Sequence, residues 1–132
     1  GVCLMDGSNA IFEDVLFDDS QAFIYGGSIY CSDSSPYFHN VVIEDGYCDP
    51  SGGGVYVCGD GCPIFENVTI RRNKGSHRGG GVSCEGGEVM LLNCLLYEND
   101  GKAGGAVYCS NGTLHIEGTT IYGNLSVEVS ID

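Results

Sequence analysis

Short apolar stretches recur along the whole chain, and within each stretch apolar and polar residues alternate at a period of two. This alternation is typical of β-strands that bury one face. No window carries apolar residues at the i, i+3, i+4 and i+7 positions of an amphipathic helix. The pattern therefore predicts an all-β chain.

The stretches belong to a repeat, which is clearest where a glycine pair precedes an apolar anchor residue. The anchors Ile29, Val55, Val82 and Val107 are spaced 26, 27 and 25 residues apart. A degenerate first copy begins at Val2. Because side chains alternate between the two faces of a strand, we expect the anchors to share one inward face.

Each repeat has a second half with three matching positions. The first is aromatic or aliphatic, the second is polar, and the third is apolar. In chain order they are Phe12, Phe38, Phe65, Leu91 and Ile116; Asp14, Asn40, Asn67, Asn93 and Gly118; and Phe17, Ile43, Ile70, Leu96 and Ile121. A further asparagine follows at Asn73, Asn99 and Asn124. Gly and Asn at fixed offsets mark bends that need positive φ.

A repeat of this length with three short strands cannot bury its own apolar side chains. Stacking the repeats about 4.8 Å apart places equivalent residues above one another and builds one continuous core. We therefore predict an all-β fold, a right-handed parallel β-helix (solenoid) of about five coils of 25 to 28 residues. The coils are expected at 1–25, 26–51, 52–78, 79–103 and 104–132, as one domain over 1–132 or a segment of a longer β-helix.

The formal net charge is −13, from 18 acidic and 5 basic side chains. A nucleic acid is excluded as a partner, because neutralising phosphates needs Lys and Arg. No apolar run is long enough to predict membrane insertion by this segment. An acidic surface suits solubility, hard cations or neutral sugars.

Eight cysteines, an even number, are typical of disulfides in an oxidising compartment. We expect Cys3, Cys31, Cys58, Cys84 and Cys109 to occupy one column, with Cα atoms close enough for disulfides between coils. Five cysteines cannot all pair with one another, so one stays free or pairs with Cys48, Cys62 or Cys94. Cys94 replaces Val68 in its column and is expected to be a buried thiol.

Two outward strips are candidate ligand-binding surfaces. One contains Glu13, His39, Glu66, Leu92 and Glu117, and the other contains Tyr30, Tyr56 and Tyr108, with Ser83 between them. Tyrosines on a flat sheet can stack sugar rings, although stacked aromatics also stabilise the sheet itself. Glu13 and Glu66 are expected roughly 10 Å apart, near the separation used by inverting glycosidases. A solvated face is the alternative for the first strip.

The loops that close the coils are acidic. Asp18, Asp19, Glu44 and Asp45 are candidate calcium ligands, and calcium is the one cofactor that the sequence suggests. Four of the five basic residues lie between Arg71 and Arg78, together with His77. This loop either faces a carboxylated sugar or neutralises the acidic loops beside it. Asn111 and Asn124 begin glycosylation sequons, as does Asn67, which is expected to be buried in its column.

The repeat resembles that of the chlamydial polymorphic outer-membrane proteins, which carry Gly-Gly-Ala-[Ile/Leu/Val] and Phe-x-x-Asn motifs. The first motif stands here as GGSI at 26–29, GGGV at 52–55 and 79–82, and GGAV at 104–107. The second is one residue shorter, Phe-x-Asn at 38–40 and 65–67. More broadly, the chain is similar to the right-handed β-helix superfamily that includes pectate-lyase-like proteins. That fold hosts adhesins, autotransporter passengers, lyases and hydrolases, so the resemblance specifies architecture more than function.

Three functions are consistent with these patterns. The first is an extracellular or cell-surface structural and adhesive module that presents flat faces to glycans or proteins. The second is a self-associating fibre subunit that pairs open coil ends, with 125–132 as a free strand that adds to a neighbour's edge. The third is a pectate-lyase-like carbohydrate-active enzyme, which three acidic residues and a basic residue converging on one face would favour. No catalytic residue is assigned.

Overall fold

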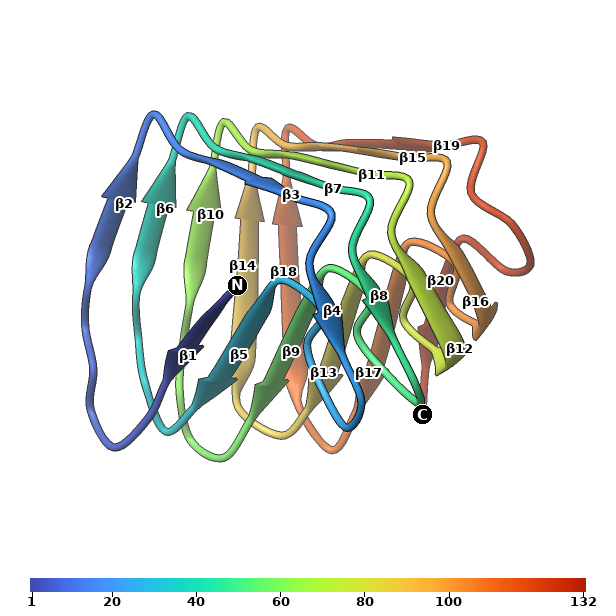
Figure 1. Ribbon diagram of the computed structural model, residues 1–132. Coiled ribbons are helices and arrows are strands. Elements are labelled where there is room, and N and C mark those ends of the chain that lie inside the picture. The colour runs from blue at the N-terminus through green and yellow to red at the C-terminus, as the bar shows by residue number, and fades with distance from the viewer.

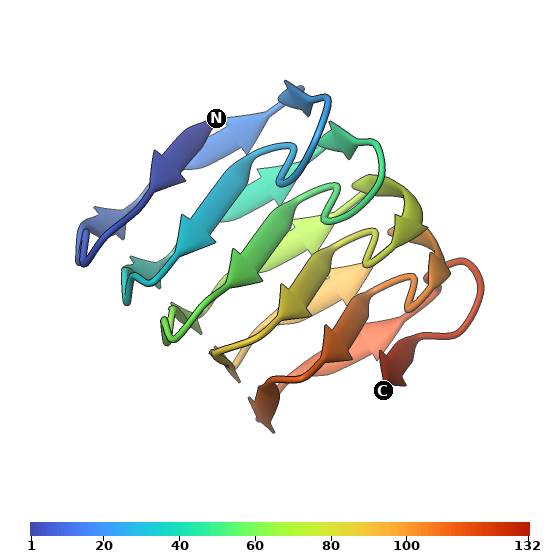
Figure 2. The same cartoon turned by 90° about the horizontal axis from the view of Figure 1, so that it is seen from below.

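The computed structural model describes all 132 residues and consists of twenty β-strands joined by turns and loops. The strands wind into coils that stack along one axis, with the N-terminus in the first coil (Figure 1). Every strand pairing is parallel. Figure 2, viewed from below, shows the coils following one another in chain order.

The strands form four sheets, named A to D, each of which takes one strand from successive coils. Sheet A contains β1 (Val2–Leu4), β5 (Ile29–Ser32), β9 (Val55–Cys58), β13 (Val82–Glu85), β17 (Val107–Ser110) and β20 (Val129–Ile131). Sheet B contains β2 (Ile11–Glu13), β6 (Tyr37–His39), β10 (Ile64–Glu66), β14 (Glu88–Leu92) and β18 (Thr113–Glu117). Sheet C contains β3 (Leu16–Asp18), β7 (Val42–Glu44), β11 (Thr69–Arg71), β15 (Leu95–Tyr97) and β19 (Thr120–Tyr122). Sheet D contains β4 (Gln21–Ala22), β8 (Tyr47–Cys48), β12 (Lys74–Arg78) and β16 (Asp100–Ala103).

The first four coils therefore have four strands each, where the sequence predicted three. The strands of sheet D escaped prediction because they are short and mostly polar, as in Lys74–Arg78, and carry no apolar alternation. They are held by backbone pairing with the neighbouring coils. Sheet D and the loops after it position the candidate site.

The predicted core columns are confirmed by the strand registers. Phe38 pairs with Phe12 and Phe65, and Ile43 pairs with Phe17 and Ile70. The Phe38 ring stacks on Phe12 with centroids 4.9 Å apart and on Phe65 with centroids 4.8 Å apart. The anchor column also aligns as expected and is completely buried at Ile29, Val55, Val82 and Val107.

The turns use the residues that the repeat singles out. Asp14, Asn40, Asn67, Asn93 and Gly118 all have positive φ, between 52° and 58°. This column lies on the surface rather than in the core, so the expectation that Asn67 is buried is wrong. The first glycine of each pair has positive φ as well, for example 71° at Gly52. A Cβ at the second glycine, Gly53, would collide with the backbone of Lys74 in sheet D of the same coil.

The later asparagines form a buried ladder inside the corner between sheets C and D. Asn73 donates to Asn99 Oδ1, and Asn99 donates to Asn124 Oδ1. The same side-chain amides also donate to carbonyls of the preceding coils, those of Ile43, Ile70 and Leu96. The ladder ends at Glu128, whose carboxylate accepts from Asn124.

The predicted cysteine column is wrong. Cys31, Cys84 and Cys109 share the inward column with Leu4 and Val57. Cys3 instead pairs with Tyr30, and Cys58 pairs with Ser32 and Glu85. Each of these two is displaced by one residue, and a displacement of one moves a side chain to the opposite face of a strand.

The expectation of a free C-terminal strand is also wrong. β20 pairs in parallel with β17, with Val129 beside Val107, and so occupies the edge of its own sheet A. The Tyr108 hydroxyl donates to Asp132 and fastens the last residue to this sheet. None of the chain forms an apolar helix of the length needed to cross a membrane.

Candidate functional site

A groove runs along the outer face of sheet A, beside the loops that leave sheet D. These loops bend back over the outward residues of sheet A. Tyr25 stacks on Tyr56 with ring centroids 4.2 Å apart, and the Arg78 guanidinium lies 5.1 Å from the Tyr108 ring centroid. The loop side chains form one wall of the groove, and Tyr30 lines it from sheet A.

The larger cavity of the groove has a volume of about 590 Å³ and lies at the first two coils. Met5, Ile24, Tyr25 and Tyr30 contribute much of its apolar lining. Tyr25 and Ile24 are exposed, and Tyr30 is half-buried beside Tyr56, with ring centroids 5.8 Å apart. This end of the groove is therefore aromatic and apolar.

The smaller cavity, of about 270 Å³, continues from Tyr25 toward the fourth coil. It is lined by Pro50, Ser51, His77, Arg78 and Glu85 in addition to Tyr25. Arg78 Nη1 lies 3.5 Å from Glu85 Oε1, and His77 Nδ1 lies 3.5 Å from Asp49 Oδ1. The groove thus changes from an apolar end to a charged end, and Tyr25 lines both cavities.

The tyrosine strip is aligned as predicted, but it is not a flat open face. Tyr56 and Tyr108 are only 5% and 3% exposed, because Tyr25, Arg78 and Asp132 cover them. Burial raises the pKa of Tyr56 well above the ordinary tyrosine value, with a smaller contribution from the Glu85 carboxylate. Tyr30 is the member of the strip that lines a cavity, and the buried two support the groove from below.

The strip of Glu13, His39, Glu66, Leu92 and Glu117 is also aligned as predicted. His39 Nδ1 lies 3.4 Å from Glu13 Oε1, and the Tyr37 hydroxyl donates to Glu66 Oε2. This hydrogen bond raises the pKa of Tyr37. Neither cavity includes any residue of the strip, so the structure gives it no enclosed site.

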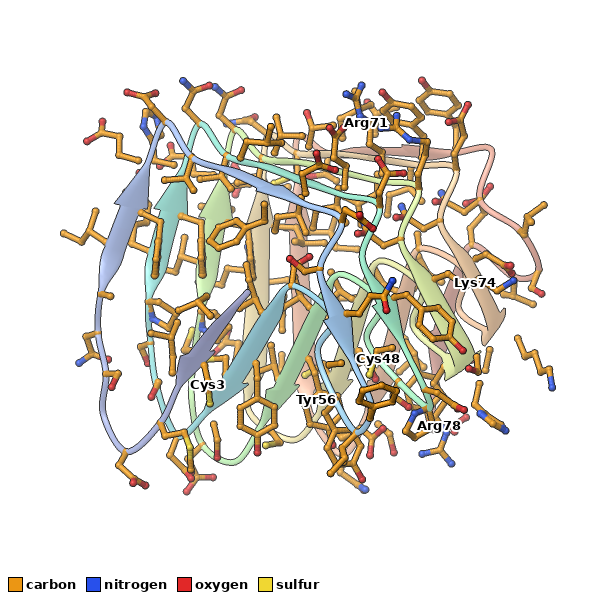
Figure 3. All side chains as sticks on the ribbon, viewed as in Figure 1. Cys3, Cys48, Tyr56, Arg71, Lys74 and Arg78 are labelled. Atoms are coloured by element: carbon orange, nitrogen blue, oxygen red, sulfur yellow. The ribbon has the colours of Figure 1, made fainter.

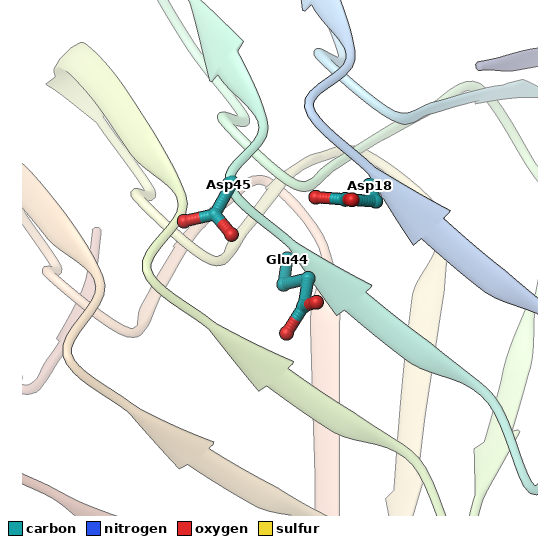
Figure 4. Close-up of side chains that lie close together, drawn as sticks. All are labelled: Asp18, Glu44 and Asp45. Atoms are coloured by element: carbon teal, nitrogen blue, oxygen red, sulfur yellow. The ribbon is translucent and has the colours of Figure 1, made fainter.

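Three of the four candidate calcium ligands converge. One carboxylate oxygen each from Asp18, Glu44 and Asp45 lies within 4.8 Å of the others, at the turn that follows sheet C (Figure 4). Asp19 is not part of this cluster. Three carboxylates on one face fit a hard divalent cation in donor type, since calcium prefers oxygen ligands.

The basic loop divides between this acidic cluster and the groove. Arg71 Nε lies 2.5 Å from Glu44 Oε2, and Arg72 Nη2 lies 2.8 Å from Asp45 Oδ2. The hydrogen bond from Arg72 lowers the pKa of Asp45. In Figure 3, Arg71 lies at the top of the view and Arg78 near the bottom. Two arginines thus neutralise the acidic turns, while Arg78 and His77 line the groove.

This acidic cluster has the composition that would favour an enzyme, three acids and a basic residue on one face. Its arginines, however, are ion-paired with two of the three carboxylates. The cluster also lies outside both cavities of the structure. Its geometry is that of a surface ion-pair network.

Burial disfavours the thiolate form of five of the eight cysteines. Burial raises the pKa of Cys31 to about 11 and that of Cys84 to about 12. Burial also raises the pKa of Cys48, Cys62 and Cys94. Cys94 is buried as predicted, and its thiol donates to the Phe65 carbonyl. All eight are free thiols in the structure.

The two predicted glycosylation sites differ in access. Asn111 is exposed at a turn with φ of 54°, as an acceptor requires. Asn124 is buried, and its side-chain nitrogen donates to Leu96, Tyr122 and Glu128. The expectation of a glycan on Asn124 is therefore wrong, because that nitrogen is part of the ladder.

Sequence reasoning missed several groove residues, among them Tyr25, Ser51 and Glu85. Tyr25 and Ser51 lie in loops of unequal length and are aligned by an isolated β-bridge between neighbouring coils. No sequence motif predicts this alignment. Glu85 is the last residue of β13 and follows the alternating residues of that strand, so the pattern does not single it out. The one indication in the sequence was the glycine pairs at 26–27 and 52–53, which predict close packing of the backbone beside these loops.

Comparisons with known proteins agree with this architecture. The family described as "Right handed beta helix region" matches residues 1–131. No curated protein and no solved structure matches the chain. The narrower resemblance to chlamydial outer-membrane and pectate-lyase-like proteins stays a prediction. The match covers nearly every residue, so this chain belongs to the right-handed β-helix family, and its predicted fold of about five stacked coils is confirmed.

Proposed function

We propose that the chain is a glycan-binding scaffold that holds a polysaccharide in the groove over sheet A. The observation that carries the proposal is the pair of cavities that share Tyr25. Together they extend from the first coil to Glu85 in the fourth, a path suited to several sugar units of a linear chain. A glycan ligand implies an extracellular or cell-surface location.

The apolar end of the groove suits the flat face of a sugar ring. Pyranose rings bind against aromatic side chains, whose large apolar faces offer contact at little conformational cost. Tyr25 and Tyr30 present such faces, and both rings are braced by stacking against the buried Tyr56. The tyrosines are therefore held in place before a ligand arrives, which reduces the entropy lost on binding.

The charged end suits a sugar that carries a carboxylate. Arg78 is about half exposed, and Glu85 lies near only one of its nitrogens, so other guanidinium donors remain available. An arginine can bind a carboxylate through two parallel hydrogen bonds. The molecule as a whole carries 18 acidic and 5 basic side chains and repels anions, so Arg78 and His77 are the groups in the groove that would attract an acidic polysaccharide.

The proposal is tested by affinity electrophoresis and calorimetry against neutral and acidic polysaccharides. Tyr25→Ala should weaken binding to both classes by about tenfold, equal to about 1.4 kcal/mol. Arg78→Gln should weaken binding to acidic polysaccharides alone. The controls are Tyr122→Ala, which removes another exposed stacked tyrosine, on sheet C, and Arg71→Gln at the acidic cluster.

The same incubations should be assayed for new chain ends. Retention without new ends supports a binding scaffold. Release of new ends would show that the chain is a carbohydrate-active enzyme instead. Equal binding by Tyr25→Ala and the unmodified chain would rule out the groove as the site.

A second candidate function, self-association through the coil ends, is favoured by where the exposed apolar side chains lie. Of twelve large hydrophobic residues with exposed side chains, six are in the first coil and five in the last. They are Met5, Ile11, Leu16, Phe23, Ile24 and Tyr25, then Ile116, Tyr122, Leu125, Val127 and Ile131. The edges of β2, β3, β18 and β19 are also unpaired, and such edges accept further strands.

Sedimentation velocity tests this second function. The first coil carries acidic residues and no Lys or Arg, so association of two copies should strengthen at high salt, which screens the repulsion. Ile11→Ser and Leu16→Ser should weaken it, whereas Tyr47→Ser, at the one exposed apolar residue of a middle coil, should not. A monomer at every salt and protein concentration would contradict self-association.

A further inference from the structure

Cys84 and Cys109 lie directly opposite one another on neighbouring strands of sheet A. Cys84 in β13 pairs in register with Cys109 in β17. Both side chains point into the core, where their residues are 0% and 1% exposed. Their sulfur atoms therefore project from the same face of the sheet, one coil apart.

No other cysteine has a cysteine as its in-register neighbour on an adjacent strand. The neighbours are Tyr30 for Cys3, Leu4 and Val57 for Cys31, Ala22 and Gly75 for Cys48, and Ser32 and Glu85 for Cys58. Cys62 and Cys94 lie outside the strands. The register thus isolates one pair from the many pairings that eight cysteines allow.

The spacing of the pair suits a disulfide. Neighbouring strands of a sheet lie about 4.8 Å apart, which falls inside the range of Cα separations that disulfides span. In the reduced structure, the Cys84 thiol donates to the Gly86 carbonyl over 3.1 Å. Bond formation would replace this weak hydrogen bond by a covalent link between the fourth and fifth coils.

We propose that Cys84 and Cys109 are a disulfide site that joins these coils when the chain folds with a small disulfide oxidant such as glutathione disulfide. The first thiolate attacks the oxidant and releases one glutathione thiol, and the second then displaces another. One protein S–S bond forms while one glutathione S–S bond breaks. The two protons and two electrons of the protein thiols pass to two glutathione molecules.

The site is expected to react during folding rather than afterwards, because both sulfurs are buried in the finished core. The bond closes a loop whose length is that of one repeat, and it lowers the entropy of the unfolded chain. It should therefore raise Tm by roughly 5–10 °C. This inference is independent of any ligand in the groove.

The experiment refolds the reduced 132-residue chain in a glutathione redox buffer and then alkylates the remaining thiols. Peptide mass spectrometry should find a linked pair that contains Cys84 and Cys109, with both protected from alkylation. Addition of a reductant should return Tm to the value of the reduced chain. Cys84→Val introduces a valine like Val57, the neighbour in the same column. This variant should fold and show no redox-dependent Tm shift.

Cys31→Val is the matched control, because it makes the same exchange in the same column and leaves the pair intact. It should keep both the linked peptide and the Tm shift. The proposal would be overturned if Cys84 and Cys109 remained alkylatable after oxidative refolding, or if either sulfur were found linked to another cysteine. A Tm shift that persisted in Cys84→Val would also overturn it.

Discussion

The side-chain nitrogen of Asn73 donates to Oδ1 of Asn99 over 3.0 Å, and the same oxygen accepts the Asn73 backbone N–H at 3.1 Å. One asparagine oxygen thus satisfies two donors of the preceding coil. Both residues are fully buried. This relationship fastens successive coils at a corner where the backbone turns away from its sheet and would otherwise leave polar groups without partners.

Replacing Asn99 by Ala should destabilise the chain by about 3 kcal/mol, because it leaves several buried polar groups unpaired. Urea unfolding followed by circular dichroism measures the change. The matched control is Asn67→Gly in the surface asparagine column, which keeps the positive φ and should cost less than about 1 kcal/mol. Equal losses in the two variants would show that the buried ladder has no special role.

The stacked aromatic column predicts a second difference in stability between a core variant and a surface variant. Phe38→Ala should cost about 3–5 kcal/mol, because it removes a completely buried ring between two stacked neighbours and leaves a cavity. Phe23→Ala should change stability by less than about 0.5 kcal/mol, since Phe23 is 92% exposed. Thermal unfolding of the two variants beside the unmodified chain is the measurement.

Alkaline pH should destabilise the reduced chain through its buried thiols. Burial raises the pKa of Cys31 from 9.0 to about 11, so the unfolded chain loses this proton at lower pH than the folded chain does. The stability contributed by the neutral thiol is complete below pH 9 and is lost as pH rises toward 11. The slope reaches at most about 1.4 kcal/mol per pH unit for each such thiol.

Unfolding by urea in the presence of a reductant, over this pH range, measures the effect. Cys31→Val should show a shallower loss of stability than the unmodified chain. A parallel pH dependence in both proteins would assign the alkaline loss to other groups.

The acidic cluster predicts weak calcium binding that its arginines suppress. Calorimetric titration with calcium should give a weak dissociation constant for the unmodified chain, of the order of 10⁻³ M. Arg71→Gln combined with Arg72→Gln should tighten binding by about tenfold or more, because Glu44 and Asp45 lose their ion-pair partners.

Asp18→Asn, added to the double variant, should reverse the gain, since Asp18 supplies the third carboxylate. If removal of the arginines leaves calcium affinity unchanged, the three carboxylates do not act together as a cation site.

Much of the fold was predictable because the repeat consists of side chains that must stack on their equivalents in neighbouring coils. Phe12, Phe38 and Phe65 recur with the same two-residue spacing to a polar turn residue, and only one register stacks all three rings on the inward face. The Asn and Gly positions predicted bends for the same reason, since few other residues adopt positive φ without strain.

The cysteines show where sequence alignment stops. Cys31 follows the anchor Ile29 by two residues, whereas Cys58 follows Val55 by three. Aligning the motifs by residue type obscures this difference in spacing. In a strand the difference matters, because a shift of one residue moves a side chain from the core face to the surface face. The fully buried Cys31 and the half-buried Cys58 are the result.

The stacked coils, the inward columns and the turns could be predicted from the amino-acid pattern, because each depends on local periodicity repeated from coil to coil. Three relationships became visible only in the folded chain. Tyr25 covers Tyr56, Arg78 lines a groove while Arg71 forms an ion pair, and Cys84 faces Cys109. These relationships depend on how loops of unequal length fold back across neighbouring coils. The physical reason is that a loop's path is set by packing and backbone pairing between coils, which no single repeat encodes.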